Sequence, residues 1–199
     1  MAISDRFNRL VGKSRYVVSR IFVHLQGQEI STLLGVLNRN ARNAIEAEGD
    51  LDTMGECLEN ICQSLLESQV YWQSASNEGD VFWKEEEAGD YVEDLFADSA
   101  SRYLSQPDWR DDSSDDSSFS LPVTDNIVVM LTVAFTGEVP EIETDLAEIE
   151  SLTNALKALI SLHYKQQYQA IAIHFSPSSL GETLTAEQTI VNFSELIPL

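Results

Sequence analysis

Three histidines are the side chains of this sequence best suited to acid–base chemistry or metal binding. His24, His163 and His174 could supply a general base or a pair of metal ligands. However, His163 falls in the last turn of a predicted helix, where a cation complements the helix dipole. His174 lies inside an apolar predicted strand, with no cysteine or second histidine beside it. We therefore expect structural roles for these two and predict no catalytic residue.

Two cysteines and an aspartate-rich run are the other candidate metal ligands. Cys57 and Cys62 lie on different faces of a helical stretch that lacks a nearby histidine, whereas a zinc site needs four ligands. The run DDSSDDSS within residues 110–120 lacks the central glycine and final glutamate of a calcium-binding loop. We expect buried thiols in a reducing compartment, and the sequence predicts neither a metal nor a cofactor.

Motifs that mark common enzyme classes are missing from the chain. It contains no G-x-S-x-G nucleophile elbow, no G-x-G-x-x-G and no Walker loop. Because there are 33 acidic residues, two carboxylates will lie close together by chance, so an acidic pair carries little weight. We expect a protein that is not an enzyme. The alternative is a small hydrolase or ligand-binding enzyme with its site at the C-terminal ends of parallel strands.

Charge is distributed unevenly along the 199 residues. The net charge is −21, yet residues 1–42 hold seven basic and two acidic side chains, which leaves five basic and 31 acidic ones for the remainder. A field this negative repels phosphate backbones, so we expect no nucleic-acid partner. A protein partner fits better. No apolar run reaches the roughly 18 residues of a membrane span, and no secretory signal is present, so we expect a cytoplasmic protein.

The basic N-terminal segment is the strongest candidate for an interaction site. Residues 4–13 have the spacing of a short amphipathic helix, which suits an anionic membrane surface or an acidic partner. The alternative is a helix that packs on its own acidic domain. The candidate residues are Arg6, Phe7, Arg9, Leu10, Lys13 and Arg15.

A second interaction candidate lies in the acidic stretch 77–89. Phe82 and Trp83 stand there among five carboxylates, and an acidic loop with exposed aromatic residues could dock a basic partner. The other interpretation is that both aromatic residues pin the loop onto the core.

The hydrophobic periodicity predicts strands and helices that could position these residues. Four segments have the spacing of amphipathic helices: residues 29–46, a segment that begins after Asp50, residues 90–104, and a segment from Leu146 to His163 that Thr144 and Asp145 precede. Thr185 with Gln188 forms a capping box for a short last helix. We expect an α+β fold: a small three-stranded sheet with a C-terminal βαβ unit, covered by an N-terminal helical hairpin and further helices. The predicted strands are Tyr16 to Gln26, Ile127 to Phe135 and Gln169 to Phe175.

The chain divides by composition into four segments of one domain. The predicted segments are a basic amphipathic segment (1–14), a strand and helical region (15–109), an acidic Asp/Ser linker (110–120) and a βαβα C-terminal part (121–199).

Several stretches resemble a known family. NIVVMLTVAF, TDLAEIESL, YQAIAIHFSP and LTAEQTIVNFSELIPL look like the C-terminal half of an uncharacterised domain family of cyanobacteria and chloroplasts, and LLESQVYW resembles its central part. That family includes plastid proteins linked to acclimation to fluctuating light. The resemblance implies a non-enzymatic accessory, assembly or regulatory factor that acts through protein contacts, associated with photosynthetic complexes and peripheral to the thylakoid membrane. It implies no catalytic residue.

Overall fold

One antiparallel sheet forms the centre of the molecule. The computed structural model describes residues 13–104, 124–178 and 182–199. Their strands lie in the order β4-β3-β1-β2-β5, and every neighbouring pair is antiparallel. The fold is therefore α+β with a five-stranded sheet. The strands are β1 Tyr16–Gln26, β2 Trp72–Phe82, β3 Asn126–Thr136, β4 Tyr168–Ser176 and β5 Ile197–Pro198.

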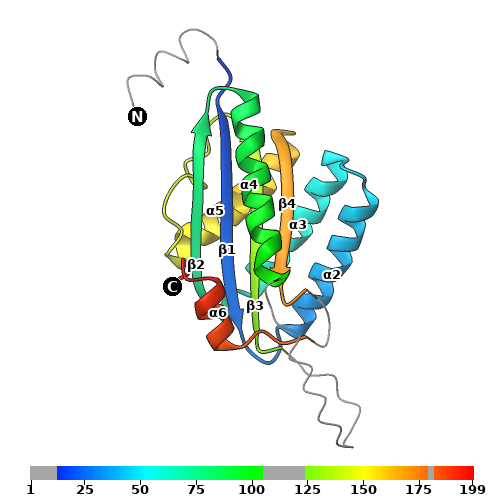
Figure 1. Cartoon of the computed structure of the whole chain (residues 1–199), viewed down its shortest axis with the longest axis vertical. Coiled ribbons are helices and arrows are strands. Elements are labelled where there is room, and N and C mark those ends of the chain that lie inside the picture. Colours follow the sequence, from blue (N-terminus) through cyan, green and yellow to red (C-terminus); the bar gives the residue numbers. More distant parts are fainter. Residues whose placement is uncertain (1–12, 105–123, 179–181) are drawn as a thin grey trace, which may run out of the picture.

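The expectation of three strands with a parallel βαβ unit is wrong. The connection between β3 and β4 returns the chain to the end of the sheet at which β3 ends, so that β4 runs in the opposite direction. Residues 138–148 first run beside β2, where the Asn77 side chain donates to the Thr144 carbonyl (2.9 Å) and accepts from the Leu146 amide (3.1 Å). Helix α5 (Ile149–Tyr164) then crosses behind the sheet to the end where β3 stopped (Figure 1). β4 consequently runs antiparallel to β3, and the two strands share no C-terminal edge at which the alternative enzyme site could lie.

Strand β2 was not predicted, because its side chains do not favour a strand. The sequence WQSASNEGDVF contains a single β-branched residue. It pairs with β1 along almost its whole length, and at Gly79 the backbones are so close that a Cβ atom would lie 2.3 Å from the Val18 carbonyl oxygen. Backbone pairing with β1, rather than side-chain propensity, makes this segment a strand.

Helices cover both faces of the sheet (Figure 1). The Asp50 side chain accepts a hydrogen bond from the Thr53 amide (2.9 Å) and so caps α3, and the capping box of Thr185 and Gln188 at α6 is confirmed. Helix α4 lies in front of the sheet in Figure 1 and α5 behind it. Besides α5, the helices are α2 Ser31–Glu46, α3 Leu51–Glu67, the 3-10 turn η1 Gln69–Tyr71, α4 Glu85–Leu104 and α6 Ala186–Asn192.

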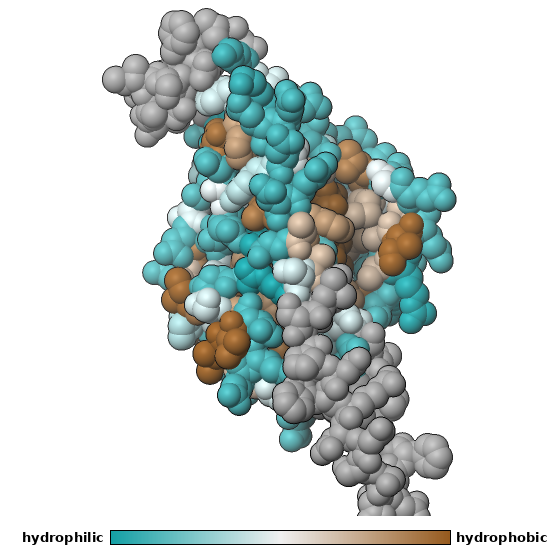
Figure 2. Space-filling view, viewed as in Figure 1, coloured by the Kyte–Doolittle hydropathy of each residue, from teal (hydrophilic) through white to brown (hydrophobic). Residues whose placement is uncertain are grey.

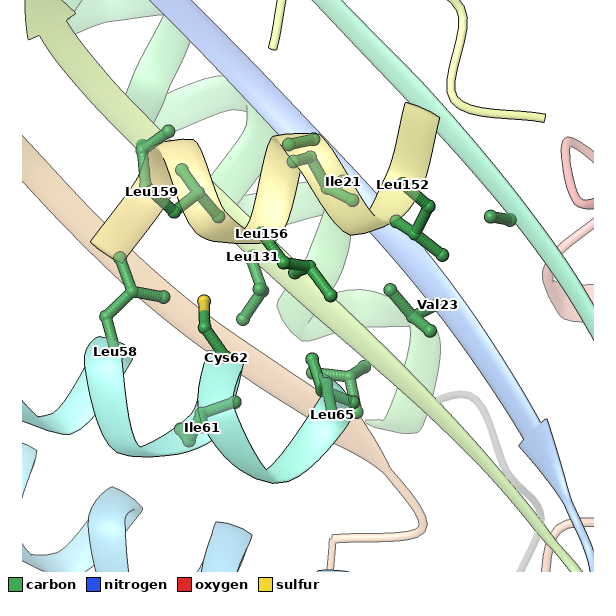
Figure 3. Packing of buried hydrophobic residues seen from close by; sticks show 14 of the residues in the cluster. Ile21, Val23, Leu58, Ile61, Cys62, Leu65, Leu131, Leu152, Leu156 and Leu159 are labelled. Atoms are coloured by element: carbon green, nitrogen blue, oxygen red, sulfur yellow. The ribbon is translucent and has the colours of Figure 1, made fainter. Parts of the chain in front are cut away.

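The face covered by α2, α3 and α5, which we call the apolar face, carries the main core. From β1 it receives Val17, Ile21, Val23 and Leu25, which are all buried. In Figure 3, leucines of α5 and the side chains of α3 converge on Ile21, Val23 and Leu131. Burying apolar area at about 25 cal/mol per Å² makes this cluster the main source of stability.

The opposite face, which we call the polar face, lies under α4 and α6. Its apolar contacts form two smaller clusters, around Val18 under α4 and around Phe22 near α6. Between them stand buried polar side chains, which include Arg20, Thr132 and His174. This face holds the candidate site.

Strand β4 forms one edge of the sheet. Of the described strands it pairs only with β3. Its sequence YQAIAIHFS contains no Asp, Glu, Lys or Arg, although 23% of the chain is charged.

Candidate functional site

Strand pairing brings the polar side chains of the polar face side by side. Arg20 of β1 lies opposite Glu78 of β2 and Thr132 of β3. Two residues further along β1, Phe22 lies opposite Ser76. Since residues two apart in a strand point to the same face, these side chains all meet the underside of α4 or the space next to it.

Arg20 is the centre of this group. It is only 2% exposed, and its Nε donates to Oε1 of Glu78 (2.9 Å). Its Nη1 lies 2.7 Å from Oδ2 of Asp98 on α4 and donates to the Leu95 carbonyl (3.0 Å) and to Ser99 Oγ (2.7 Å). A buried guanidinium must be paired in this way, because an uncompensated charge in the interior is costly. Arg20 therefore ties the middle of the sheet to α4.

A second arginine extends the group towards the C-terminus. Arg102 of α4 contacts Asp98 (2.9 Å) and Glu195 (2.5 Å), and it donates to the Asn192 carbonyl (2.9 Å). The Phe22 ring lies 4.8 Å from the Arg20 guanidinium and 5.2 Å from that of Arg102, within the range of cation–π contact.

Asp98 is shared by both arginines. Burial raises its pKa, but the hydrogen bonds from Arg20 and Arg102 outweigh this effect, and the pKa lies below its ordinary value of 3.8. The carboxylate is therefore ionised at neutral pH.

A cavity of about 420 Å³ opens beside this group. Because both arginines are committed to carboxylates, the groups that remain are mainly acceptors. Among the described residues, Glu78, Asp98 and Glu195 each give one oxygen to an arginine and keep the other. The charged lining consists of two arginines and four carboxylates, so the cavity is formally negative. The lining includes the charged residues Arg20, Arg102, Glu78, Asp94, Asp98 and Glu195, together with Phe22 and Ser76.

The histidines are not assembled into one catalytic group. His24 contacts Ser74 Oγ (3.1 Å) and Asn126 Oδ1 (3.0 Å), and burial lowers its pKa. Burial and the charge of Arg20 lower the pKa of His174 to about 4, and its ring packs edge-on against Phe96 at 4.8 Å. His163 lies in the last turn of α5, as predicted, on the other side of the sheet. Each histidine has neighbours that account for a structural role.

The cysteines are buried on α3, as predicted, and burial raises the pKa of both thiols. In Figure 3, Cys62 lies among leucines of the core. Within the residues that the structure describes, no group of three or more His, Cys, Asp and Glu side chains could hold a metal ion.

The basic N-terminal candidates lie mostly outside the described residues. The candidates outside the described residues are Arg6, Phe7, Arg9 and Leu10. Lys13 is exposed. Arg15 donates to both carboxylate oxygens of Glu143 (3.0 and 2.5 Å) and to the Gly137 carbonyl (2.6 Å), so this side chain is bound to its own acidic domain.

Phe82 and Trp83 lie at the junction of β2 and α4. The stretch expected as an acidic loop is instead the end of one element and the start of the other. Both side chains are half-buried, and the Phe82 ring packs on Tyr91 with centroids 5.4 Å apart. Phe82 therefore pins this junction to the core, and Trp83 lies beside it at the start of the turn into α4.

Sequence analysis missed the group around Arg20, although a signal for it exists. Arg20, Thr132 and His174 each interrupt an otherwise apolar strand, and the register places all three on the same face. A charged or polar residue at the centre of several buried strands indicates a shared polar layer. The pairing of the strands, which gives this pattern its meaning, could not be read from the chain.

The comparisons with known proteins give a family but no activity. None of the helices in the described part of the chain has the length and apolar character needed to cross a bilayer. No curated protein and no solved structure matches the chain. A family model described as "Protein of unknown function (DUF1517)" matches residues 15–199, and the chain therefore belongs to the DUF1517 family.

Proposed function

We propose that this protein is a non-enzymatic accessory, assembly or regulatory factor that binds a basic protein partner through α4. The observation that carries the proposal is the charge of this helix. Within α4, Arg102 is the only basic residue, and the acidic side chains are all exposed. We call these acidic side chains the α4 surface: Glu85, Glu86, Glu87, Asp90, Glu93, Asp94 and Asp98.

Local stability does not explain the whole α4 surface. The three glutamates of the first turn complement the helix dipole, and Glu87 also pairs with Lys84. Asp98 is paired with Arg20 and Arg102. Asp90 and Asp94, however, follow Glu86 at four-residue spacing. Like charges at this spacing destabilise a helix by about 0.2–0.5 kcal/mol per pair. A cationic partner would relieve this repulsion.

The α4 surface is also accessible. The hydrophilic surface over the upper part of α4 faces the viewer in Figure 2. Oppositely charged surfaces steer partners towards each other and give specificity more than affinity. A negative helix of this kind suits a factor that recognises a partner without chemical conversion.

The resemblance to proteins of cyanobacteria and chloroplasts supports a setting for this role. We propose that the protein is associated with photosynthetic complexes and acts peripherally at the thylakoid membrane. The basic segment 1–14 would supply a second, salt-sensitive contact with an anionic membrane surface or an acidic partner.

Capture from an extract of the native cells tests the α4 surface. Three forms of the full chain are immobilised: the wild type, Glu86→Gln/Asp90→Asn/Glu93→Gln, and a control with Glu46→Gln/Glu48→Gln/Asp52→Asn. The control removes the same number of exposed charges near α2 and α3. We expect a basic protein to bind the wild type and the control, to be lost with the α4 variant, and to elute as salt shortens the Debye length from about 8 to about 3 Å. The purified partner should then bind the wild type and the control with similar affinity and the α4 variant more weakly. Equal binding to all three forms contradicts the proposal.

A further inference from the structure

The cavity beside Arg20 has the features of a site for a cationic group. It lies against α4 and is bordered by Asp94 and Asp98 of that helix and by Glu78 of β2. Its volume of about 420 Å³ falls within the range of small-ligand sites. The arginines in its wall are held by carboxylates and have few donors left for an anion.

A buried hydroxyl provides a second, independent indication. Ser76 lines the cavity and is 7% exposed, and its Oγ has no hydrogen-bond partner among the described residues. A buried polar atom without a partner costs about 1–3 kcal/mol. A donor that reached Ser76 Oγ from the cavity would satisfy it, and the carboxylates of Glu78 and Glu195 belong to the same lining.

We propose that this cavity binds a primary ammonium group, namely a lysine side chain of the basic partner. An ammonium group has three donors and no acceptor, which matches a cavity whose remaining groups are acceptors. The inference rests on the proposed function, because it adds an anchor point at the end of the α4 surface, where Asp94 and Asp98 line the cavity.

Lysine binding is measured with N-acetyl-lysine-N-methylamide and the ¹H–¹⁵N amide spectrum of the full chain. The norleucine analogue, which has the same stem length without the ammonium group, is the control ligand. We expect saturable shifts centred on Ser76, Glu78 and Asp94 with the lysine compound and none with norleucine.

Two pairs of variants separate the site from general charge. Ser76→Ala and Asp94→Asn should each weaken lysine binding at least several-fold. Thr132→Val removes another buried hydroxyl without a partner on the same face, and Asp80→Asn removes an exposed charge of β2, but neither residue lines the cavity or belongs to the α4 surface. Both controls should bind like the wild type. Removing an unsatisfied hydroxyl should leave the fold intact.

The inference is overturned if lysine binding does not saturate, or if Asp94→Asn and Asp80→Asn weaken it equally. This result is distinct from failure of the proposed function. The α4 variant used for capture keeps every cavity residue, so the basic partner can be lost while the lysine compound still binds. Conversely, if the wild-type chain captures the partner but shows no saturable lysine binding, the proposed function of the α4 surface stands and the lysine site is wrong.

Discussion

The two faces of the sheet differ in how their buried side chains are held. On the apolar face, β1 presents Val17, Ile21, Val23 and Leu25 to the leucines of α3 and α5. On the polar face, the alternate residues of the same strand include Arg20 and His24, which need specific partners. One strand thus serves two environments. The apolar face therefore depends on burial, whereas the polar face depends on specific hydrogen bonds and ion pairs.

The cost of the polar face supports this division. A buried ion pair contributes little net stability, because removing two charges from water cancels most of their attraction. A fold selected for stability alone could place apolar side chains at Arg20, Thr132 and Ser76, as it does across the sheet. In our proposal, binding at the cavity beside the polar layer gives these residues a role other than stability.

The largest contrast should come from adjacent residues of β1. Ile21→Ala creates a cavity in the apolar core and should lower the free energy of unfolding by about 2–5 kcal/mol. Arg20→Met keeps most of the volume, and Glu78 and Asp98 are 44% and 46% exposed, so water can solvate them. We expect a loss of at most about 1.5 kcal/mol. Urea unfolding of both variants measures the difference. If Arg20→Met is as destabilising as Ile21→Ala, the polar face is also needed for stability.

The second contrast is a dependence on pH that originates in His174. Its pKa is about 4 in the folded protein and about 6.5 when unfolded, so the unfolded chain binds the extra proton between these values. Stability should therefore fall as the pH decreases from 6.5 to 4, by roughly 2 kcal/mol at about pH 5 and roughly 3 kcal/mol at about pH 4. Urea unfolding at several pH values measures this dependence. His174→Gln should flatten it, and an unchanged slope would show that other groups titrate there.

The smallest effect concerns local opening of α4 compared with α3. Since α4 is held largely by polar contacts, its amides should exchange with deuterium faster than those of α3 at neutral pH. The pKa of Asp98 is lowered in the folded state, so its contribution is present above pH 3.8 and is lost as the pH falls through the folded value. Acidification should then release α4 before α3. Exchange measured by mass spectrometry would contradict the comparison if both helices opened together.

The parts of this fold that the sequence predicts are those with strong local patterns. The apolar runs of β1, β3 and β4, the stripes of α2 and α3 and the capping box of α6 were all located from residue spacing alone. These signals arise within one element, where a strand or helix face is visible in the order of the residues.

The missed features depend on contacts between distant segments. β2 is a strand because β1 lies beside it, and β4 is antiparallel because residues 138–148 run out along β2 before α5 returns. The site has the same origin. Arg20, Asp98 and Glu195 lie far apart in the chain, and only the folded sheet brings them together.

The uncharged edge strand β4 has a consequence for the behaviour of the protein in solution. An exposed edge can accept a strand from another molecule, and proteins usually block this with charged side chains or proline on the edge itself. Here the residues of β4 carry no such protection, so mutual repulsion between whole molecules of net charge −21 must replace it. This colloidal protection vanishes near the isoelectric point of about 4.2. At that acidity, we expect edge-to-edge association and precipitation.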